Sequence, residues 1–351
     1  MPTVLWWGRF DPGYSRNRIL RSLLGEMGWR IVDFRPTVSA IADVETHLRR
    51  LPRPDLVWVP CFRQRDLAAA RRWSHARGLP LLFDPLISAY DKQVHERGKF
   101  PPSSRQAKRL LAWERGLFHA ADLVLADTPV HAEYYQAVFD LNPDRLKVVY
   151  VGAEESLFHP LAMPRHAEGG ELEVLFYGSF IALQGPQTII EAARCYEGPA
   201  VRWTLLGAGP LRKPCEDLAR GQAHVSFEDW LPYADLPRRI HQADIVLGVF
   251  GTSDKAARVI PNKVFQALAC GRPVITRHAA AYPPALQDRD DSGLVWVGPG
   301  NPRELARAVS QLASDADSLE LLGQLAHATY RAYFCREVIA GQLAEALSAL
   351  A

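Results

Sequence analysis

The sequence of 351 residues is longer than one ordinary hydrophobic core requires, so its length predicts two domains. Hydrophobic residues make up 48% of the chain and charged residues 23%, a composition typical of ordered globular proteins that excludes a disordered chain. The net charge of +2 at pH 7 predicts no general affinity for nucleic acid.

The five cysteines are odd in number and scattered, without the close pairs that a zinc site or a disulfide framework needs. A reducing compartment fits this pattern best. The first ten residues show no basic region followed by an apolar stretch, and no run approaches the roughly 20 apolar residues of a membrane span. We therefore expect a soluble cytoplasmic protein and leave open peripheral attachment at the inner membrane face.

Short apolar segments alternate with helical segments through the first half of the chain. Helical spacing of apolar residues covers Arg18–Met27 before Gly28. The predicted strands are Thr3–Trp7, Arg30–Phe34, Leu56–Pro60, Leu81–Phe83 and Leu123–Ala126. This alternation predicts a parallel sheet covered by helices on both faces, with ligands beyond the carboxyl ends of its strands.

The first strand ends at Gly8, which permits close approach of a ligand to the backbone. Arg16 and Arg18 follow, and both could reach an anion at the mouth of the sheet. The alternative, a solvated entrance to a helix, is equally compatible with the sequence.

Acidic residues follow two later strands. Asp84 could face an acceptor hydroxyl as a catalytic group, or it could simply belong to a turn before Pro85. Asp127 and Thr128 are more typical of a helix cap before Val130–Phe139 than of a ligand site.

Residues 92–115 carry seven Lys or Arg and two Glu, interleaved with the apolar residues Phe100, Leu110, Leu111 and Trp113. Such a mixture could lie on an anionic membrane or hold a phosphorylated lipid acceptor. A solvated helix face is the commoner explanation for a charge run of this kind.

A second alternating series follows the Pro- and Gly-bearing stretch 159–170, which is typical of a linker. Its predicted strands are Glu173–Tyr177, Val201–Leu206, His224–Phe227, Ile245–Val249, Pro273–Thr276 and Gly293–Val297. Its predicted helices are Pro186–Cys195, Leu236–Gln242, Pro302–Ala313, Leu319–Tyr333 and Glu337–Leu350. The resulting domains are 1–160 and 170–333, with 334–351 as a final helical segment.

The stretch Val246–Thr276 predicts an anion site. A glycine-containing polar loop with Ser253, Asp254, Lys255 and Arg258 leads into a helix that begins at Pro261-Asn262-Lys263. Unpaired N–H groups at a helix N-terminus attract anions, and the three basic side chains add full positive charges. A diphosphate is the expected ligand. No Asp-x-Asp motif that could hold a divalent ion occurs near this loop.

Four segments resemble, in order and spacing, the nucleotide-sugar-binding half of the family-four retaining glycosyltransferases, which have the GT-B fold. They are LFYGSFIALQGPQTIIEAA, LLGAGPL, VSFEDWLPYADLPRRIHQADIVL and NKVFQALACGRPVIT. In the first half, VVYVGAEESLFHP is similar to the family's inter-domain stretch. The resemblance is close over residues 145–350 and weaker before them.

This resemblance implies two Rossmann-like domains that face a central cleft. It also implies that the final helices, Leu319–Tyr333 and Glu337–Leu350, cross back and pack on the first domain. It implies a retaining transfer of a sugar from a nucleoside-diphosphate donor to a hydroxyl acceptor, without a metal or other cofactor. A glycolipid, a polysaccharide of a biosynthetic pathway or a small molecule would be the acceptor. The family places the donor in the second domain and the acceptor in the first.

Two family glutamates eight positions apart are replaced here by Arg258 and Gln266. The family also tends to carry an Arg and a Lys in its first glycine-rich loop, where this chain has Ser179 and Gln184. Gln266 retains hydrogen-bonding capacity toward a ribose diol, whereas Arg258 cannot accept from a sugar hydroxyl. We expect Lys255, Arg258 and Lys263 to meet the diphosphate charge instead.

The resemblance thus assigns candidate residues to each part of the donor. Asp84, Arg258 and Lys263 are the candidate catalytic residues. The candidate donor-binding residues are Gly8, Gly178, Ser179, Gly207, Trp230, Leu231, Lys255, Asn262 and Gln266. Gln266 would meet the ribose and Trp230, Leu231 and Gly207 the base, although Trp230 could equally be a core aromatic.

Two alternatives remain open from the sequence. A nucleotide-sugar epimerase would share the fold, but the basic loop provides no cluster of acids with a histidine. A non-catalytic protein that has kept the fold is the second alternative, because both family glutamates are absent. The sequence does not identify the base, the sugar, the acceptor or the linkage.

Overall fold

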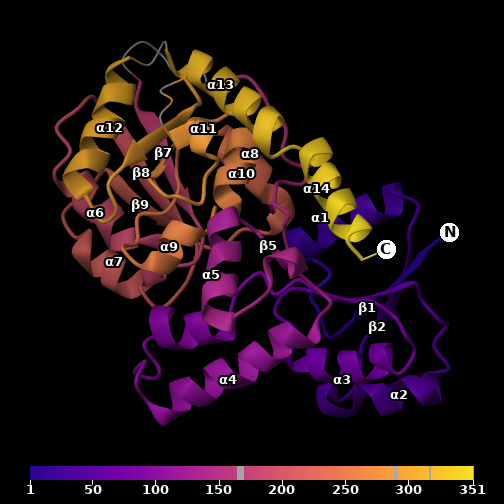
Figure 1. Ribbon diagram of the computed structural model, residues 1–351. Helices are drawn as coiled ribbons and strands as arrows, with labels where there is room; N and C mark the ends of the chain where they lie inside the picture. The colour runs from indigo at the N-terminus through magenta and orange to yellow at the C-terminus, as the bar shows by residue number, and fades with distance from the viewer. Residues whose placement is uncertain (164–169, 288, 290, 316–317, 351) are drawn as a thin grey trace. The chain divides into compact units, whose positions relative to one another are not determined.

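The computed structural model describes residues 1–163, 170–287, 289, 291–315 and 318–350 (Figure 1). The chain divides into two compact units. Unit 1 comprises residues 1–151 and 336–351, and unit 2 comprises residues 152–335. Of the predicted linker, residues 164–169 lie outside the described part of the chain.

Unit 1 contains a six-stranded sheet in the order β2-β1-β3-β4-β5-β6, in which all neighbouring strands are parallel. Its strands are β1 (Thr3–Trp7), β2 (Arg30–Phe34), β3 (Leu56–Val59), β4 (Leu81–Phe83), β5 (Leu123–Ala126) and β6 (Leu146–Val148). The residues of β1, β3, β4 and β5 are buried, as expected for central parallel strands covered on both faces.

Helices connect these strands and bury their apolar faces against the sheet. They are α1 (Ser15–Glu26), α2 (Ala42–Arg49), α3 (Gln64–His75), α4 (Arg105–Ala120) and α5 (Pro129–Phe139). Shorter segments are η1 (Ser39–Ile41), η3 (Pro143–Arg145) and the π-helical η2 (Asp91–Glu96). Thr128 caps α5, because its side chain accepts a hydrogen bond from the His131 N–H at 3.1 Å, which confirms the predicted cap.

The last helix, α14 (Arg336–Ser348), belongs to unit 1 although it follows the whole of unit 2 in the sequence. Its Gln342 side chain accepts a hydrogen bond from the Tyr150 N–H at 3.0 Å, and Glu345 lies 3.1 Å from Lys147 Nζ. Ile339 and Leu343 are fully buried. The predicted return of the C-terminal helix to the first domain is therefore confirmed.

Unit 2 contains a second parallel sheet of six strands, in the order β12-β11-β10-β7-β8-β9. The strands are β7 (Leu172–Tyr177), β8 (Val201–Leu206), β9 (Val225–Glu228), β10 (Ile245–Leu247), β11 (Val274–Arg277) and β12 (Leu294–Val297). This is the strand order of a Rossmann fold, in which the chain reverses direction across the sheet between its first and fourth strands.

The helices of unit 2 cover this sheet. They are α6 (Pro186–Arg194), α7 (Arg212–Leu218), α8 (Leu236–His241), α9 (Asp254–Arg258), α10 (Asn262–Ala269), α11 (Pro284–Gln287), α12 (Pro302–Ser314) and α13 (Ser318–Tyr333), with the short η4 (Ala182–Gln184) and η5 (Tyr233–Asp235). Proline begins α6 and α12, where its missing N–H has no intrahelical partner to lose. The fold is thus two Rossmann-like halves, as predicted.

Two expectations about helices were wrong. The loop predicted around Ser253 contains the helix α9, because the Ser253 hydroxyl accepts a hydrogen bond from the Ala256 N–H and caps its first turn. The helix α13 does not return to the first domain with α14. It stays in unit 2, where Gly323 lets its backbone approach that of Gly271 too closely for any larger residue.

Within the described ranges, no helix combines the length and the apolar character needed to cross a bilayer.

Candidate functional site

The strands β7 and β10 lie side by side at the centre of the sheet of unit 2, and the chain leaves them in opposite directions. Open parallel sheets bind ligands at this switch point, beyond the carboxyl ends of the strands. β7 is followed by Gly178, and β10 by Gly248 and the loop that leads to α9 and α10. The site is therefore built around Gly178 and the N-terminus of α10.

Gly178 and Gly207 bring two strand-end loops into close backbone contact. Both have positive φ values, +143° and +135°, which side chains rarely allow. A Cβ atom on Gly207 would lie 2.0 Å from the carbonyl oxygen of Gly178. The Gly178 N–H donates to the Leu206 carbonyl at 3.0 Å. The close approach of the loops after β7 and β8 thus requires glycine at Gly207, and the positive φ favours glycine at Gly178.

Lys263 places a buried positive charge beside Gly178. It lies in the first turn of α10 and is 5% exposed. Its Nζ lies 3.6 Å from the centre of the Phe176 ring, and a Cβ atom on Gly178 would lie 3.2 Å from it. Nζ has no hydrogen-bond partner among the described residues. Burial lowers the pKa of this ammonium well below its usual value.

Two glutamine side chains lie close to Lys263. The Oε1 of Gln184 is buried without a hydrogen bond to any described residue and would lie 3.9 Å from a Cβ atom on Gly178. The Tyr177 hydroxyl donates to Gln266 Oε1 at 3.0 Å and lies 3.2 Å from the Lys263 carbonyl. Burial raises the pKa of Tyr177 well above its usual value, so this hydroxyl remains a donor. Gln266 consequently has its amide N–H groups to offer a ligand.

Tyr177 was not among the residues predicted from the sequence. It appeared only as the last residue of an apolar strand, and the strand pattern gives no sign that its hydroxyl reaches α10. Its position directly before the glycine of the loop is the one feature that could have suggested a role.

The other predicted basic residues lie on the segment between β10 and α10. Lys255 is 5% exposed and lies on α9, whereas Arg258, at the end of α9, and Asn262 are half-buried. Arg277 at the end of β11 supports this segment, because its Nη1 donates to the Gly251 carbonyl at 2.5 Å. Burial lowers the pKa of Arg277.

The predicted base-binding residues lie beyond β8 and β9. Trp230 is 55% exposed, so the alternative of a core aromatic does not hold. Ser179 is exposed and Leu231 half-buried. Arg212 links the two strand ends, since its Nη1 donates to the carbonyl oxygens of Gly207 at 2.6 Å and Glu228 at 2.7 Å.

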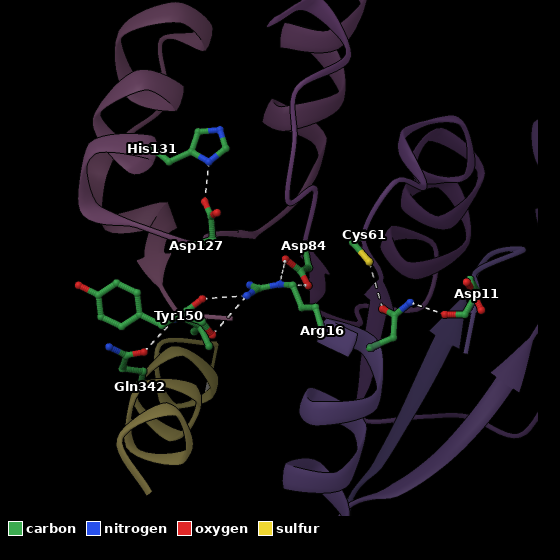
Figure 2. Close-up of polar contacts among 10 residues, drawn as sticks. Asp11, Arg16, Cys61, Asp84, Asp127, His131, Tyr150 and Gln342 are labelled. Carbon is green, nitrogen blue, oxygen red and sulfur yellow. Dashed lines mark hydrogen bonds and ion pairs between the residues drawn. The ribbon is translucent and has the colours of Figure 1, made fainter. Parts of the chain in front are cut away.

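In unit 1, Asp84 at the end of β4 forms an ion pair with Arg16 in the first turn of α1 (Figure 2). Arg16 Nε donates to both carboxylate oxygens, at 2.9 and 2.8 Å, and Nη1 donates to the Val149 carbonyl at 2.9 Å. Both side chains are fully buried. Burial raises the pKa of the Asp84 carboxyl, and Arg16 opposes this rise.

This geometry corrects two expectations. Arg16 does not reach an anion at the mouth of the sheet, because it already neutralises Asp84 inside unit 1. Asp84 is neither a plain turn residue nor accessible to an acceptor hydroxyl in this arrangement. The pair ties the end of β4 to α1 and to the segment after β6. The sequence gives no sign of this contact because 68 residues separate its partners.

A second buried polar pair lies nearby in unit 1. Asp127 Oδ1, at the end of β5, lies 2.5 Å from His131 Nδ1 on α5 (Figure 2). Cys61, after β3, donates its thiol to Asn17 Oδ1 at 3.3 Å. Gly8 is buried at the end of β1, where its N–H donates to the Phe34 carbonyl at 2.9 Å. Arg16 with Asp84 and Asp127 with His131 thus form pairs within unit 1 (Figure 2), while the buried Nη2 of Arg16 has no hydrogen-bond partner among the described residues.

The structure therefore brings Gly178, Gly207, Lys263 and Gln266 together at the switch point of unit 2, with Gln184 and Tyr177 added. Gly8 and Asp84 belong to unit 1. Among the described residues, no group of three His, Cys, Asp or Glu side chains is placed to hold a metal ion.

Two family models match the chain, one in each half. Residues 16–152 match the glycosyl transferase 4-like domain, and residues 171–315 match the glycosyl transferases group 1. Together they account for most of the chain, including both Rossmann-like halves. The protein belongs to this family of glycosyltransferases.

The similar curated proteins include a D-inositol 3-phosphate glycosyltransferase of Acidothermus cellulolyticus, 28% identical over 74% of this chain and 59% of the relative. The spore coat protein SA of Bacillus subtilis is 24% identical over 51% of this chain and 52% of the relative. The chain therefore spans just over half the length of these relatives.

Solved structures with the same fold include sucrose-phosphate synthase of Thermosynechococcus elongatus, with a TM-score of 0.75 at 18% identity and complete coverage of both chains. The HepE protein of Anabaena in complex with UDP has a TM-score of 0.69 at 18% identity, over 99% of this chain and 100% of that one. These likenesses confirm the GT-B fold.

Proposed function

We propose that this protein transfers a sugar, with retention of its anomeric configuration, from a nucleoside-diphosphate sugar to a hydroxyl acceptor. The observation that carries this proposal is the Lys263 ammonium, which is buried beside Gly178 without a counter-charge or hydrogen-bond partner among the described residues. An anion would stabilise the charged form of Lys263 in this position, and the described residues supply none.

The chemistry of such a transfer explains why a cation is needed there. As the bond to the sugar breaks, negative charge grows on the departing diphosphate, and fixed positive groups stabilise it in the transition state. Lys263 would meet this charge directly, together with the N-terminus of α10 and with Lys255, Arg258 and Asn262. These groups would replace a metal ion, so we propose a metal-independent reaction.

The other residues that we propose to contact the donor also belong to unit 2. Gln266 would donate to the ribose hydroxyls, since Tyr177 already occupies its amide oxygen. Ser179 and the loop after Gly178 would line the diphosphate, and the exposed Trp230 with Leu231 and Gly207 would face the base. UDP is the first nucleotide to test, because the structurally similar HepE protein has been crystallised with UDP and with UDP-glucose.

The acceptor would bind to unit 1, beyond the carboxyl ends of its parallel strands. A glycolipid, a polysaccharide or a hydroxylated small molecule fits the proposal, and the relatives named for D-inositol 3-phosphate make a phosphorylated polyol the first small acceptor to test. Asp84 has no proton-transfer role in this proposal, because Arg16 holds its carboxylate inside unit 1.

The non-catalytic alternative is favoured by the absence of both family glutamates. Against it stands the cost of keeping Lys263 buried without a counter-charge, which no structural role in the described residues explains. The epimerase alternative lacks a specific observation in its favour.

The test compares the binding of UDP to the wild-type protein and to the variant Lys263→Met, by thermal shift and calorimetry, with and without EDTA. We expect UDP to stabilise the wild-type protein to the same extent in both conditions, since ligand binding to the folded state raises stability. The variant should bind UDP at least about a hundredfold more weakly, because a buried charge-assisted contact is lost.

A matched control is Lys108→Met, which removes an exposed lysine from unit 1 and should leave UDP binding unchanged. Unaltered UDP affinity in Lys263→Met would contradict the proposed site, and failure of all nucleoside diphosphates to bind would favour a non-catalytic protein. Nuclear magnetic resonance of the released sugar, from incubation with UDP-glucose, would show whether its configuration is retained.

A further inference from the structure

The helix α4 and the segment before it expose a strongly basic surface on unit 1. Its members share exposure to solvent and the absence of a carboxylate partner among the described residues. They are Arg97, Lys99, Arg105, Lys108 and Arg109, with Trp113 at one side, and we call them the basic face. Arg105, Lys108 and Arg109 follow the spacing that places residues on one side of a helix.

The acidic residue of α4 points away from this surface. Glu114 is fully buried on the opposite side of the helix, together with Ala107, Leu117 and Phe118. Its carboxylate accepts hydrogen bonds from the Ser88 hydroxyl at 2.7 Å and from the N–H groups of Ala89 at 2.6 Å and Tyr90 at 2.7 Å. It therefore cannot neutralise the basic face.

No Asp or Glu occurs between Arg97 and Trp113 in the sequence, and no ion pair joins these cations to a described carboxylate, so the segment itself does not compensate its positive charge. An ordinary solvated helix alternates charges of both signs, which lowers the repulsion between like charges. On the basic face that repulsion remains, although the net charge of the whole chain is only +2. The charge is thus concentrated rather than spread over the surface.

Trp113 adds an apolar group to this charged surface. Its side chain is 42% exposed and lies one helical turn after Arg109. An indole ring has an apolar body and one N–H donor, and such rings collect at the level of lipid headgroups. The combination of several cations with a single exposed indole suits the interface of a bilayer better than bulk water.

We propose that the basic face docks unit 1 on the surface of a membrane that contains anionic lipids. The cations would lie against the headgroups and Trp113 would enter the interface, while the apolar side of α4 stays in the core of unit 1. This docking is independent of the proposed transfer, because none of its residues belongs to the donor site. Among anionic partners, a lipid surface is favoured over a nucleic acid because Trp113 is the one large apolar residue exposed on α4.

The test is sedimentation of the full chain with vesicles of phosphatidylcholine alone or of phosphatidylcholine mixed with phosphatidylglycerol. We expect binding only to the mixed vesicles, and a loss of that binding as salt is raised, because salt screens exposed charges. The triple variant Arg105→Glu, Lys108→Glu and Arg109→Glu should lower the fraction bound at least about tenfold, since each cation contributes separately.

The control is a second triple variant with the same change in net charge, at three exposed arginines of unit 2: Arg238→Glu, Arg303→Glu and Arg307→Glu. It should bind the mixed vesicles as the wild-type protein does. Equal loss of binding in both triple variants would overturn the proposal, because a general charge effect would then explain it. Equal binding of the wild-type protein to both kinds of vesicle would also overturn it.

A measurement on the wild-type protein alone covers the case in which a variant fails to fold. Hydrogen exchange of residues 97–115 should slow on mixed vesicles and remain unchanged with phosphatidylcholine. Slowing by a short DNA duplex instead, with no effect of the vesicles, would show that the basic face recognises a different polyanion and would overturn the assignment to lipid.

Discussion

The carboxyl ends of the two sheets carry buried charges that differ in whether a side chain of opposite charge neutralises them. In unit 1, Arg16 and Asp84 neutralise each other and the Arg16 guanidinium also binds a backbone carbonyl. In unit 2, Lys263 is almost as deeply buried, but its ammonium faces an aromatic ring and a glycine instead of a carboxylate. Two sheets of the same type thus present one buried charge that a carboxylate neutralises and one that no described residue neutralises.

This difference separates groups that hold the fold from groups that are placed for a ligand. A buried charge with its partner contributes to a defined structure, whereas a buried charge without one lowers stability unless a ligand completes it. On this basis Asp84, although acidic and at a strand end, is structural, and Lys263 is the better candidate for function.

The largest effect should follow from breaking the completed pair. Asp84→Asn leaves the Arg16 guanidinium buried without a counter-charge, and we expect it to lower the free energy of unfolding by about 3–5 kcal/mol. Urea denaturation followed by far-UV circular dichroism would measure this loss.

The double variant Arg16→Met with Asp84→Leu is the control for this prediction, because it removes both charges and keeps apolar volume. It should recover most of the stability lost in Asp84→Asn. A loss below about 1 kcal/mol in Asp84→Asn would mean that the pair is accessible to water and that unit 1 does not differ from unit 2 in the way described.

An intermediate effect should follow from removing the unpaired charge. Without ligand, Lys263→Met should be more stable than the wild-type protein near neutral pH, on the order of 1–3 kcal/mol, because a desolvated ammonium is lost. The pKa of Lys263 is lower in the folded chain than in the unfolded chain, where it is about 10.4. Between these two values the unfolded state binds more protons, so the wild-type protein gains stability as pH rises.

The stability difference between the two proteins should therefore shrink as pH is raised toward the unfolded pKa, and UDP affinity should fall over the same range. Thermal melts at several pH values would measure the first effect and calorimetric titrations the second. A stability difference that does not change with pH would show that Lys263 keeps its usual pKa, and the contrast with Arg16 would then rest on geometry alone.

The smallest effect concerns Gln266, which stands where the family has the glutamate that meets the ribose. Gln266→Glu restores the carboxylate of the family, to which Tyr177 can still donate. We expect UDP affinity to change by no more than about tenfold, with a larger preference for UDP over 2′-deoxy-UDP, because a carboxylate accepts from ribose hydroxyls. Calorimetry with both nucleotides tests this. An unchanged preference would indicate that residue 266 does not contact the ribose.

Much of the fold followed from the sequence because each strand is a short buried apolar run bounded by glycine or a polar loop. Thr3–Trp7 and Leu123–Ala126 were predicted with the boundaries that the structure shows. The edge strand β6 was missed because its three residues are only half-buried and carry no apolar run. The place of α13 was also missed, because helical periodicity shows that a face is apolar without showing which surface it covers.

The candidate site was predictable only where local chemistry identifies it. The helix start at Asn262 and Lys263 indicated an anion site from the sequence, and the structure places Lys263 beside the predicted Gly178. The contact between Tyr177 and Gln266 spans 89 residues and the contact between Arg16 and Asp84 spans 68, so no local pattern could reveal them. Their discovery required the three-dimensional arrangement of the strand ends.

The position of α14 sets a constraint on how the chain folds during its synthesis. The first Rossmann-like half leaves the ribosome early, but Ile339 and Leu343, which complete its surface, are synthesised only after all of unit 2. Until then, the apolar surface that α14 covers on unit 1 remains open to solvent and to other nascent chains. Unit 1 can therefore be completed only after the whole of unit 2 has been synthesised.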